Sequence, residues 1–443
     1  MRRRRRWIIA LTLLAAAALL ATSLVRLGPT LRGAGVLGPA GGAASSSPSR
    51  SGGGSSAGDP ATAVKPVLAA RAKAVLRHDR AAFLATVDRR RTTFYRAQAA
   101  LYDRMVTVPF SDLAYQMRAP ARDLANARVR RRYAPSKVYL SEVKASYRFR
   151  GQDSAPVTSH YYYTFALTSA GWRLAGQGDL PAPRTSDVEI WDSTPVRNLS
   201  TARTLVVYHP GDRALAQRLL DAGERGFSQV DAAWSARWDH KVVILVPRDQ
   251  GEAERLVHGR DMSDAAAVSA SQFEAGSGHR VLGNRVIVNT TFMKRYSTLA
   301  VQVVVTHEMT HVATREVGLG VPLFLVEGFA DYTAWRPVDL PLRVSRQALA
   351  VAVRDGRFDG KLPSDDEIIG ASGALAYDEA SSFCLWVSRT FGAAKLQSLY
   401  RSFSSFQQRP RLQQQVDQKV RQVLGISLAT AQSRWAAFVR QAM

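Results

Sequence analysis

The amino-acid sequence predicts an α+β protein whose folded part follows a membrane-spanning helix. Three observations lead to this fold class. The chain opens on a long uncharged apolar run, it then changes from helical to strand-like hydrophobic spacing, and its second half passes from strands to long helices. With 443 residues, 46% of them hydrophobic, the chain is long enough for two or three domains with sizeable cores.

The apolar run extends from Trp7 to Val25 and directly follows arginines at positions 2–6. Its length suits a helix that crosses a bilayer, and basic residues before such a helix are typical of the cytoplasmic side. We therefore predict an uncleaved anchor in residues 1–26 of a single-pass cell-membrane protein, with the later domains extracytoplasmic. The alternative is a cleaved signal peptide and a secreted protein. Residues 27–62, rich in Gly, Ser and Ala, are expected to form a flexible linker.

Residues 63–185 are expected to form a small domain in which helices precede a curved antiparallel sheet. Apolar residues have helical spacing over 64–88 and 92–104, and the stretches 137–149 and 160–178 are rich in β-branched and aromatic residues. This order of elements, with the segment "AVLRHDRAAFLATVD", resembles the NTF2-like fold. The resemblance implies a cone that either binds a small ligand or acts as a spacer or interaction module.

The net charge of +24 comes from basic residues, mostly arginine, that are spread along the chain. Because they form only short clusters, such as 89–91 and 128–132, we predict no nucleic-acid partner and a basic surface that favours acidic or envelope-bound substrates. The single cysteine, Cys384, rules out an intramolecular disulfide. It lies in an apolar segment, where it is expected to pack as a small hydrophobic residue.

The segment "THEMTH" places two histidines, His307 and His311, four residues apart. On a helix this spacing puts both imidazoles on one face, so both can bind one metal ion. Glu308 projects about 100° away from His307, where it can reach a water molecule beside the ion without binding the ion itself. Ser297 as N-cap and Gly318 as helix end support a helix here. The competing interpretation is a buried helix with two hydrogen-bonded histidines and no metal.

The third ligand decides which chemistry this helix supports. No histidine follows His311. Thr314 and Val317 stand where a metzincin has its glycine and third histidine, so that class is excluded. The next predicted helix carries Glu327 and Asp331 four residues apart on one face. Because the connection from His311 is short, the two helices are expected to be neighbours, and a carboxylate can approach the histidine pair.

The two helices together, "HEMTH" followed by "EGFADY", resemble the gluzincin metallopeptidases of the peptidase-MA-like group. The resemblance implies Zn²⁺ as cofactor, with His307, His311 and Glu327 as its ligands. It also implies that Glu308 is the general base and that Asp331 hydrogen-bonds a ligating histidine. Three protein ligands leave a fourth position for water, whereas a closed structural site would have four ligands, usually including cysteine.

The resemblance covers about residues 200–443 and implies a zincin-like α+β domain with a strand layer and a helical C-terminal half. Strands are predicted at 204–209, 241–247, 266–270 and 284–289, and a helix at 211–236. The segment 373–392 looks like a helix of this family in which a tyrosine assists catalysis. Tyr377 is therefore the candidate donor to the tetrahedral oxyanion, against a role in helix packing alone.

The sequence thus predicts a membrane-anchored, zinc-dependent metallopeptidase that hydrolyses peptide bonds of an extracytoplasmic peptide or protein. Zinc-activated water would be the nucleophile, with Glu308 as general base. The alternative is a cell-envelope binding or scaffold protein that holds the metal without cleaving anything. The strand at 284–289 is a candidate edge for an extended peptide, although an internal strand has the same pattern.

Overall fold

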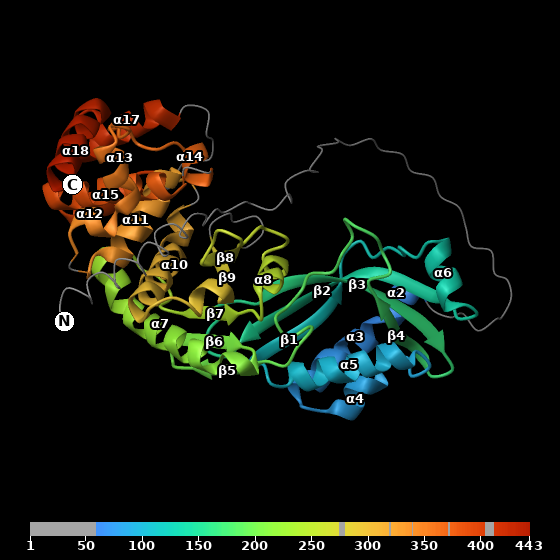
Figure 1. Cartoon of the computed structure of the whole chain (residues 1–443). Helices are drawn as coiled ribbons and strands as arrows, with labels where there is room; N and C mark the ends of the chain where they lie inside the picture. The colour runs from blue at the N-terminus through green and yellow to red at the C-terminus, as the bar shows by residue number, and fades with distance from the viewer. Residues whose placement is uncertain (1–58, 274–279, 319, 339, 371–372, 404–411) are drawn as a thin grey trace, which may run out of the picture.

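The computed structural model describes residues 59–273, 280–318, 320–338, 340–370, 373–403 and 412–443. Within these ranges two sheets follow one another along the chain and a helical region comes last. The N-terminal helices, in blue, lie beside the first sheet, whereas the C-terminal helices, in red, lie at the other end of the molecule, beyond the second sheet (Figure 1).

Short helices precede the first sheet, and the first long helix of the prediction is divided in two. The bounds are α2 (Pro60–Ala63), α3 (Lys65–Leu76), α4 (Arg80–Ala85) and α5 (Thr92–Met105). The break lies at His78, whose φ of 56° is not helical. Asp79 then caps α4, because its carboxylate accepts a hydrogen bond from the backbone N–H of Ala82 at 2.9 Å. Local capping therefore divides a segment whose apolar spacing is continuous.

The first sheet is antiparallel, with the strand order β1-β2-β3-β4, and helices α3 and α5 pack against it. The bounds are β1 (Phe110–Met117), β2 (Val138–Phe149), β3 (Val157–Thr168) and β4 (Gly171–Gln177), with α6 (Ala127–Tyr133) between the first two. The long strands β2 and β3 form a curved ribbon that extends toward the second sheet (Figure 1).

The segment between the two sheets packs back onto the first sheet. The indole of Trp191 meets the rings of Phe110 and Tyr147 edge-on, each at a centroid distance of 5.2 Å. The guanidinium of Arg104 donates hydrogen bonds to the carbonyl oxygens of Trp191 and Asp192, at 2.7 and 2.6 Å. The connection is therefore part of the core rather than a loose link.

The second sheet is mixed, with the strand order β5-β6-β7-β9-β8. The bounds are β5 (Arg197–Ser200), β6 (Thr204–Tyr208), β7 (Val242–Val246), β8 (Ala267–Phe273) and β9 (Val281–Val288). Strands β6, β7 and β9 are parallel, whereas β5 and β8 pair antiparallel at the two edges. Of the two alternatives for 284–289, the internal strand is confirmed, because β9 is paired with β7 on one side and with β8 on the other. The edge strand next to β9 is β8.

The two faces of the second sheet belong to different cores. Val206 and Ile244 pack into a core with the helices α7 (Arg213–Ala233) and α10 (Thr298–Gly318). Their neighbours in the strands, such as Leu205, pack into a core that also contains the first sheet and the connecting segment. The helix that carries the histidines thus lies on one face of this sheet, and the N-terminal part of the molecule supports the other face.

The remaining helices form the C-terminal end of the molecule or connect strands. Their bounds are α8 (Gln250–Leu256), α9 (Thr290–Met293), α11 (Leu323–Trp335), α12 (Leu342–Ser345), α13 (Gln347–Arg354), α14 (Asp365–Ile369), α15 (Gly373–Phe391), α16 (Ala393–Arg401), α17 (Leu412–Leu424) and α18 (Leu428–Ala442). Helix α11 packs closely against both α10 and α15.

The structure corrects the predicted fold class and the predicted localisation at the membrane-spanning helix. The predicted anchor in residues 1–26 lies outside the described residues. Among the helices of the described ranges, none is both long and apolar enough to cross a bilayer. Long helices such as α10 also carry polar and charged side chains. The fold of the described residues is therefore α+β without a membrane helix, which corrects the predicted fold class, and these residues contain no helix that supports the single-pass localisation. The last residues of the predicted linker also differ from the expectation, since α2 begins at Pro60.

Candidate metal centre

Helix α10 places His307 and His311 on one face inside the protein. The helix begins after Ser297, whose hydroxyl accepts a hydrogen bond from the backbone N–H of Ala300 at 3.2 Å, so the predicted N-cap is confirmed. Both histidines are buried, with 0% and 3% of their surface exposed. Helices α7 and α11 and the strand β8 surround α10, so tertiary packing fixes a helix whose valine-rich sequence is a poor helix former by itself.

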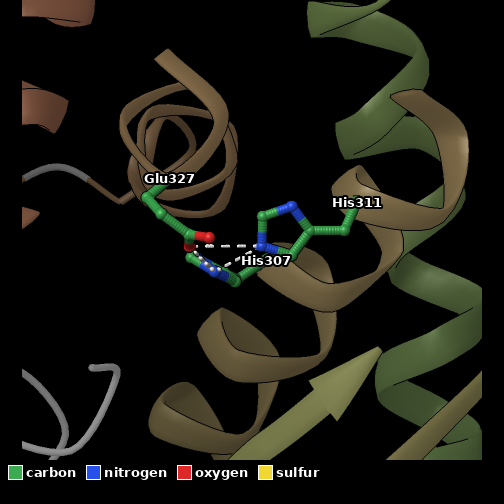
Figure 2. A group of neighbouring side chains, drawn as sticks. All are labelled: His307, His311 and Glu327. Carbon is green, nitrogen blue, oxygen red and sulfur yellow. Dashed lines mark hydrogen bonds and ion pairs between the residues drawn. The ribbon is translucent and has the colours of Figure 1, made fainter. Parts of the chain in front are cut away.

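Glu327 of α11 points its carboxylate at the two histidines (Figure 2). The Nε2 atoms of His307 and His311 lie 3.0 Å apart. The Oε2 atom of Glu327 lies 3.2 Å from the first of these nitrogens and 3.3 Å from the second. The three atoms therefore form a nearly equilateral triangle of two imidazole nitrogens and one carboxylate oxygen, and all three side chains are buried.

Glycine allows α11 to approach its neighbour closely enough to hold Glu327 in this place. A Cβ atom at Gly328 would lie 2.5 Å from the carbonyl oxygen of Ala380 in α15. No residue with a side chain fits there without a shift of the two helices. The close packing of α11 on α15 thus requires glycine at position 328, the residue that follows the Glu327 carboxylate in the "EGFADY" segment.

Asp331 orients one of the histidines from behind. Its Oδ1 atom lies 2.9 Å from Nδ1 of His307, so the imidazole donates its Nδ1–H to the carboxylate. In the neutral ring that bond keeps the proton on Nδ1 and leaves Nε2, which faces Glu327 and His311, as the atom with the lone pair that a metal ligand requires. The sequence expectation that Asp331 lies behind a histidine of the group agrees with this geometry.

The electrostatics of the group favour a bound cation. Burial by itself lowers the pKa of His307, but Asp331 and Glu327 outweigh burial and raise it well above the usual value. Burial likewise raises the pKa of Glu327, but His311 and His307 outweigh it and lower that pKa to about 2. Both shifts mean that the buried group stabilises a negative carboxylate beside positive charge at the nitrogens.

The geometry fits zinc. Bonds of about 2.0–2.2 Å at tetrahedral angles separate neighbouring ligand atoms by about 3.3 Å. The observed separations of 3.0, 3.2 and 3.3 Å lie within a few tenths of an ångström of that value. Both carboxylate oxygens of Glu327 are buried without a hydrogen bond of good geometry, although Oε2 is within ion-pair distance of both rings. A metal ion would supply the partner that this buried carboxylate lacks.

The two other predicted residues lie beside this group. Glu308 is buried in α10, next to His307 in the chain. Tyr377 of α15 is also buried, and its ring is stacked near that of His307, with a centroid distance of 6.4 Å and an interplanar angle of 29°. The structure therefore brings five of the selected residues together from three helices, and Glu308 lies buried in the same helix as the two histidines.

Arg315, which was not among the predicted site residues, lies on the same face of α10. It lies one helical turn beyond His311 and is buried, with 7% of its surface exposed. A spacing signal was present, because 307, 311 and 315 are each four apart. Its neighbour Ser269 in β8 carried no signal, since the contact joins residues 46 positions apart.

Comparison with known proteins adds no family to this picture, because no protein-family model matches the chain and no curated protein matches it significantly. The functional inference therefore depends on the motif and on the geometry of the group.

Proposed function

We propose that the protein is a zinc-dependent metallopeptidase of the gluzincin type that hydrolyses peptide bonds. The observation that carries this proposal is the triangle formed by the Nε2 atoms of His307 and His311 and the Oε2 atom of Glu327. Two nitrogens and one oxygen are the ligand set of catalytic zinc in peptidases of this type, which leaves one position for water or substrate. The described group contains no cysteine and no fourth carboxylate or histidine ligand, so it does not match a closed structural site.

When bound, zinc would act as a Lewis acid that polarises the scissile carbonyl and makes a water molecule nucleophilic at neutral pH. Glu308 then takes the proton of the attacking water on its carboxylate and delivers it to the leaving amine. Glu308 directly follows His307 on α10, is buried, and projects about 100° round the helix from that ligand.

Two other side chains prepare the site for this reaction. Asp331 holds the imidazole of His307 in one tautomer and one orientation through the bond at 2.9 Å. Tyr377 packs beside the same imidazole, and its hydroxyl is the proposed donor to the oxyanion that develops on the substrate carbonyl. Neither residue needs to contact the ion.

The first test is the zinc content of the full-length protein, measured by elemental analysis after dialysis, with Glu327→Ala as the variant. About one zinc per chain in the wild type, and much less in a folded variant, supports the ligand set. The absence of zinc from the folded wild type contradicts the proposal.

The second test separates catalysis from metal storage. Glu308→Gln is expected to retain zinc and to lose cleavage of a peptide library almost completely, because the proton acceptor is gone. Zinc retention with no cleavage by either protein would instead favour a scaffold that holds the metal without catalysis.

A further inference from the structure

Arg315 connects the motif helix to the edge of the second sheet. Its Nη2 atom donates hydrogen bonds to the carbonyl oxygen of Ser269 at 3.2 Å and to the hydroxyl of the same residue at 2.8 Å. Ser269 belongs to β8, the edge strand that pairs with β9 on one side. The guanidinium is therefore held in a fixed place between the helix that carries the two histidines and the outer strand of the sheet.

The charge of Arg315 lacks a close counter-ion. No carboxylate of the described residues forms an ion pair with this guanidinium, and its buried Nε atom forms no hydrogen bond. The buried Arg285, by contrast, is held by both oxygens of Asp153, at 2.7 and 2.9 Å. An arginine side chain stays protonated in proteins, so burial without an anion carries a large desolvation cost.

The surroundings only partly offset that cost. Burial lowers the pKa of Arg315, and this effect exceeds the opposing effects of Tyr400, Glu308 and Glu327. Guanidinium groups bind carboxylates through two parallel hydrogen bonds, and this is the strongest partner that a buried arginine can gain. A ligand that brings a carboxylate to Arg315 would recover part of the desolvation cost.

Arg315 lies close to two places at which a peptide substrate is expected to bind, the edge strand β8 and the metal centre. An edge strand offers backbone groups to which an extended peptide can add as another strand, although the carbonyl of Ser269 already accepts a hydrogen bond from Arg315. A peptide that lies along β8 passes Ser269, the residue to which Arg315 is bonded. Arg315 is also only one helical turn from His311. When the scissile peptide bond of a substrate lies at the metal centre, the neighbouring groups of that substrate are therefore within reach of the guanidinium.

We propose that Arg315 is a specificity-determining residue that binds a carboxylate group of the peptide substrate. The inference rests on the proposed function, because it assumes that a peptide binds at the metal centre. The carboxylate has two possible sources. A free C-terminal carboxylate would make the protein a carboxypeptidase, and an Asp or Glu side chain would make it an endopeptidase with an acidic preference.

The test measures binding rather than turnover. The protein is the full-length Glu308→Gln variant with its zinc content verified, so that labelled peptides remain intact. Three peptides share one sequence: the first ends in a free carboxylate, the second in an amide, and the third is an amide with one internal Gln replaced by Glu. Fluorescence anisotropy gives a Kd for each. We expect the first or the third peptide to bind at least about tenfold more tightly than the second, and the tighter peptide identifies the source.

Substitution of Arg315 in this background assigns the preference to its side chain. Arg315→Gln is expected to abolish the preference for the carboxylate, and Arg315→Lys to retain part of it, because lysine keeps the charge but loses the two-pronged geometry. The matched control is Arg71→Gln. Arg71 is also buried without a carboxylate ion pair, but it packs in the core of the N-terminal part beside Phe83, so the preference should persist.

Equal binding of all three peptides would overturn the inference. So would a preference that persists in a folded, zinc-loaded Arg315→Gln variant. If that variant does not fold, Arg315→Lys and Ser269→Ala decide the question. The second removes the hydroxyl that anchors the guanidinium, and an undiminished preference in both would refute the role. Wild-type protein that cleaves amide and carboxylate peptides equally well would refute this inference while the proposed function stands. Failure to cleave any peptide would count against the proposed function.

Discussion

His307 meets a carboxylate with each of its two ring nitrogens. Nδ1 is bonded to Asp331 at 2.9 Å, and Nε2 lies 3.2 Å from Glu327. The first contact fixes the proton on Nδ1 and thereby keeps Nε2 available as a ligand atom. The two carboxylates thus have different tasks, since one binds the ion and the other orients the ring.

Asp331→Asn tests this division of tasks. The amide is nearly isosteric and its oxygen can still accept the Nδ1–H, but it carries no charge, so the hydrogen bond weakens and the basicity of the ligand falls. We expect zinc affinity to fall by roughly 10–100-fold, measured by competition with a chromophoric chelator. Asp366→Asn, an exposed change on α14, is the control and should bind zinc like the wild type. Unchanged affinity in Asp331→Asn would show that the second carboxylate does not support the ligand.

Tyr377→Phe tests the proposed oxyanion donor. The substitution removes one hydroxyl and keeps the ring that packs beside His307 at a centroid distance of 6.4 Å. We expect kcat for a peptide substrate to fall by roughly 100-fold, the usual effect of losing one such donor, with zinc content and stability nearly unchanged. Full activity in the variant would assign Tyr377 to helix packing alone.

At the residue scale, the spacing of residues along a single helix predicted site residues, whereas contacts between distant segments of the chain could not be predicted. His307, His311, Glu327 and Asp331 could be selected because each pair is four residues apart on one helix. The bond between Arg315 and β8 depends on how helix and sheet are placed relative to each other, which no local pattern encodes. The distances within the triangle likewise follow from the packing of α11 on α10.

At the element scale, the helix pair α11 and α15 fixes the position of the Glu327 carboxylate. The helices approach closely at Gly328, where an added Cβ would lie 2.5 Å from the carbonyl oxygen and 3.1 Å from the Cβ of Ala380. The obstacle is largely backbone, so it cannot move aside as the end of a flexible side chain can.

Gly328→Ala should therefore separate the two helices. We expect a loss of about 1–3 kcal/mol in the free energy of unfolding, measured with urea, because the clash outweighs the better helix propensity of alanine. Zinc affinity should also fall, since Glu327 precedes the altered residue. Gly211→Ala is the control, because its added Cβ meets nothing within 4 Å. A Gly328→Ala protein as stable as the wild type would contradict the close approach.

The second sheet shows which strands can be predicted from sequence patterns and which cannot. The four predicted strands correspond to β6, β7, β8 and β9, because apolar runs bounded by polar turns specify buried strands well. The short strand β5 has no such run and was missed. The sequence left open whether 284–289 is an edge or an internal strand, because β9 is equally apolar whether or not a further strand pairs with it.

At the scale of the whole molecule, the two sheets share a core. Aromatic residues of the first sheet, Trp191 of the connecting segment and one face of the second sheet belong to the same cluster. The paired hydrogen bonds between Arg285 of β9 and Asp153, which follows β2, connect the sheets directly. The domains 63–185 and 200–443 expected from the sequence therefore share contacts. Whether each folds as a separate unit stays a prediction, because composition does not reveal which residues pack across a domain boundary.

Buried acids line this shared region and make its stability depend on pH. Glu189 accepts hydrogen bonds from the hydroxyls of Tyr147, at 3.1 Å, and Ser159. Burial raises its pKa to about 7, although the hydrogen bond from Ser159 opposes the rise. Burial also raises the pKa of the neighbouring Asp192 to about 7. In the unfolded chain both carboxyls return to ordinary values near 4.

The sign of the effect follows from proton binding. Between about pH 4.5 and 7 the folded protein retains a proton on Glu189 that the unfolded chain has lost, so the free energy of unfolding decreases as the pH rises through this window and levels off above it. Glu189→Gln is neutral at every pH and removes this contribution. The stability of the variant relative to the wild type should rise by roughly 2–3 kcal/mol from pH 5 to pH 8.

Urea unfolding of zinc-free protein in chelator measures this difference without interference from the pH dependence of metal binding. Glu224→Gln is the control. Although burial opposes it, hydrogen bonds from Thr201, Thr204 and Arg203 lower the pKa of Glu224, so its titration lies below the window and the variant should follow the wild-type slope. If Glu189→Gln also followed that slope, Glu189 would be charged in the folded protein, and the shared core would have to contain a cation that balances it.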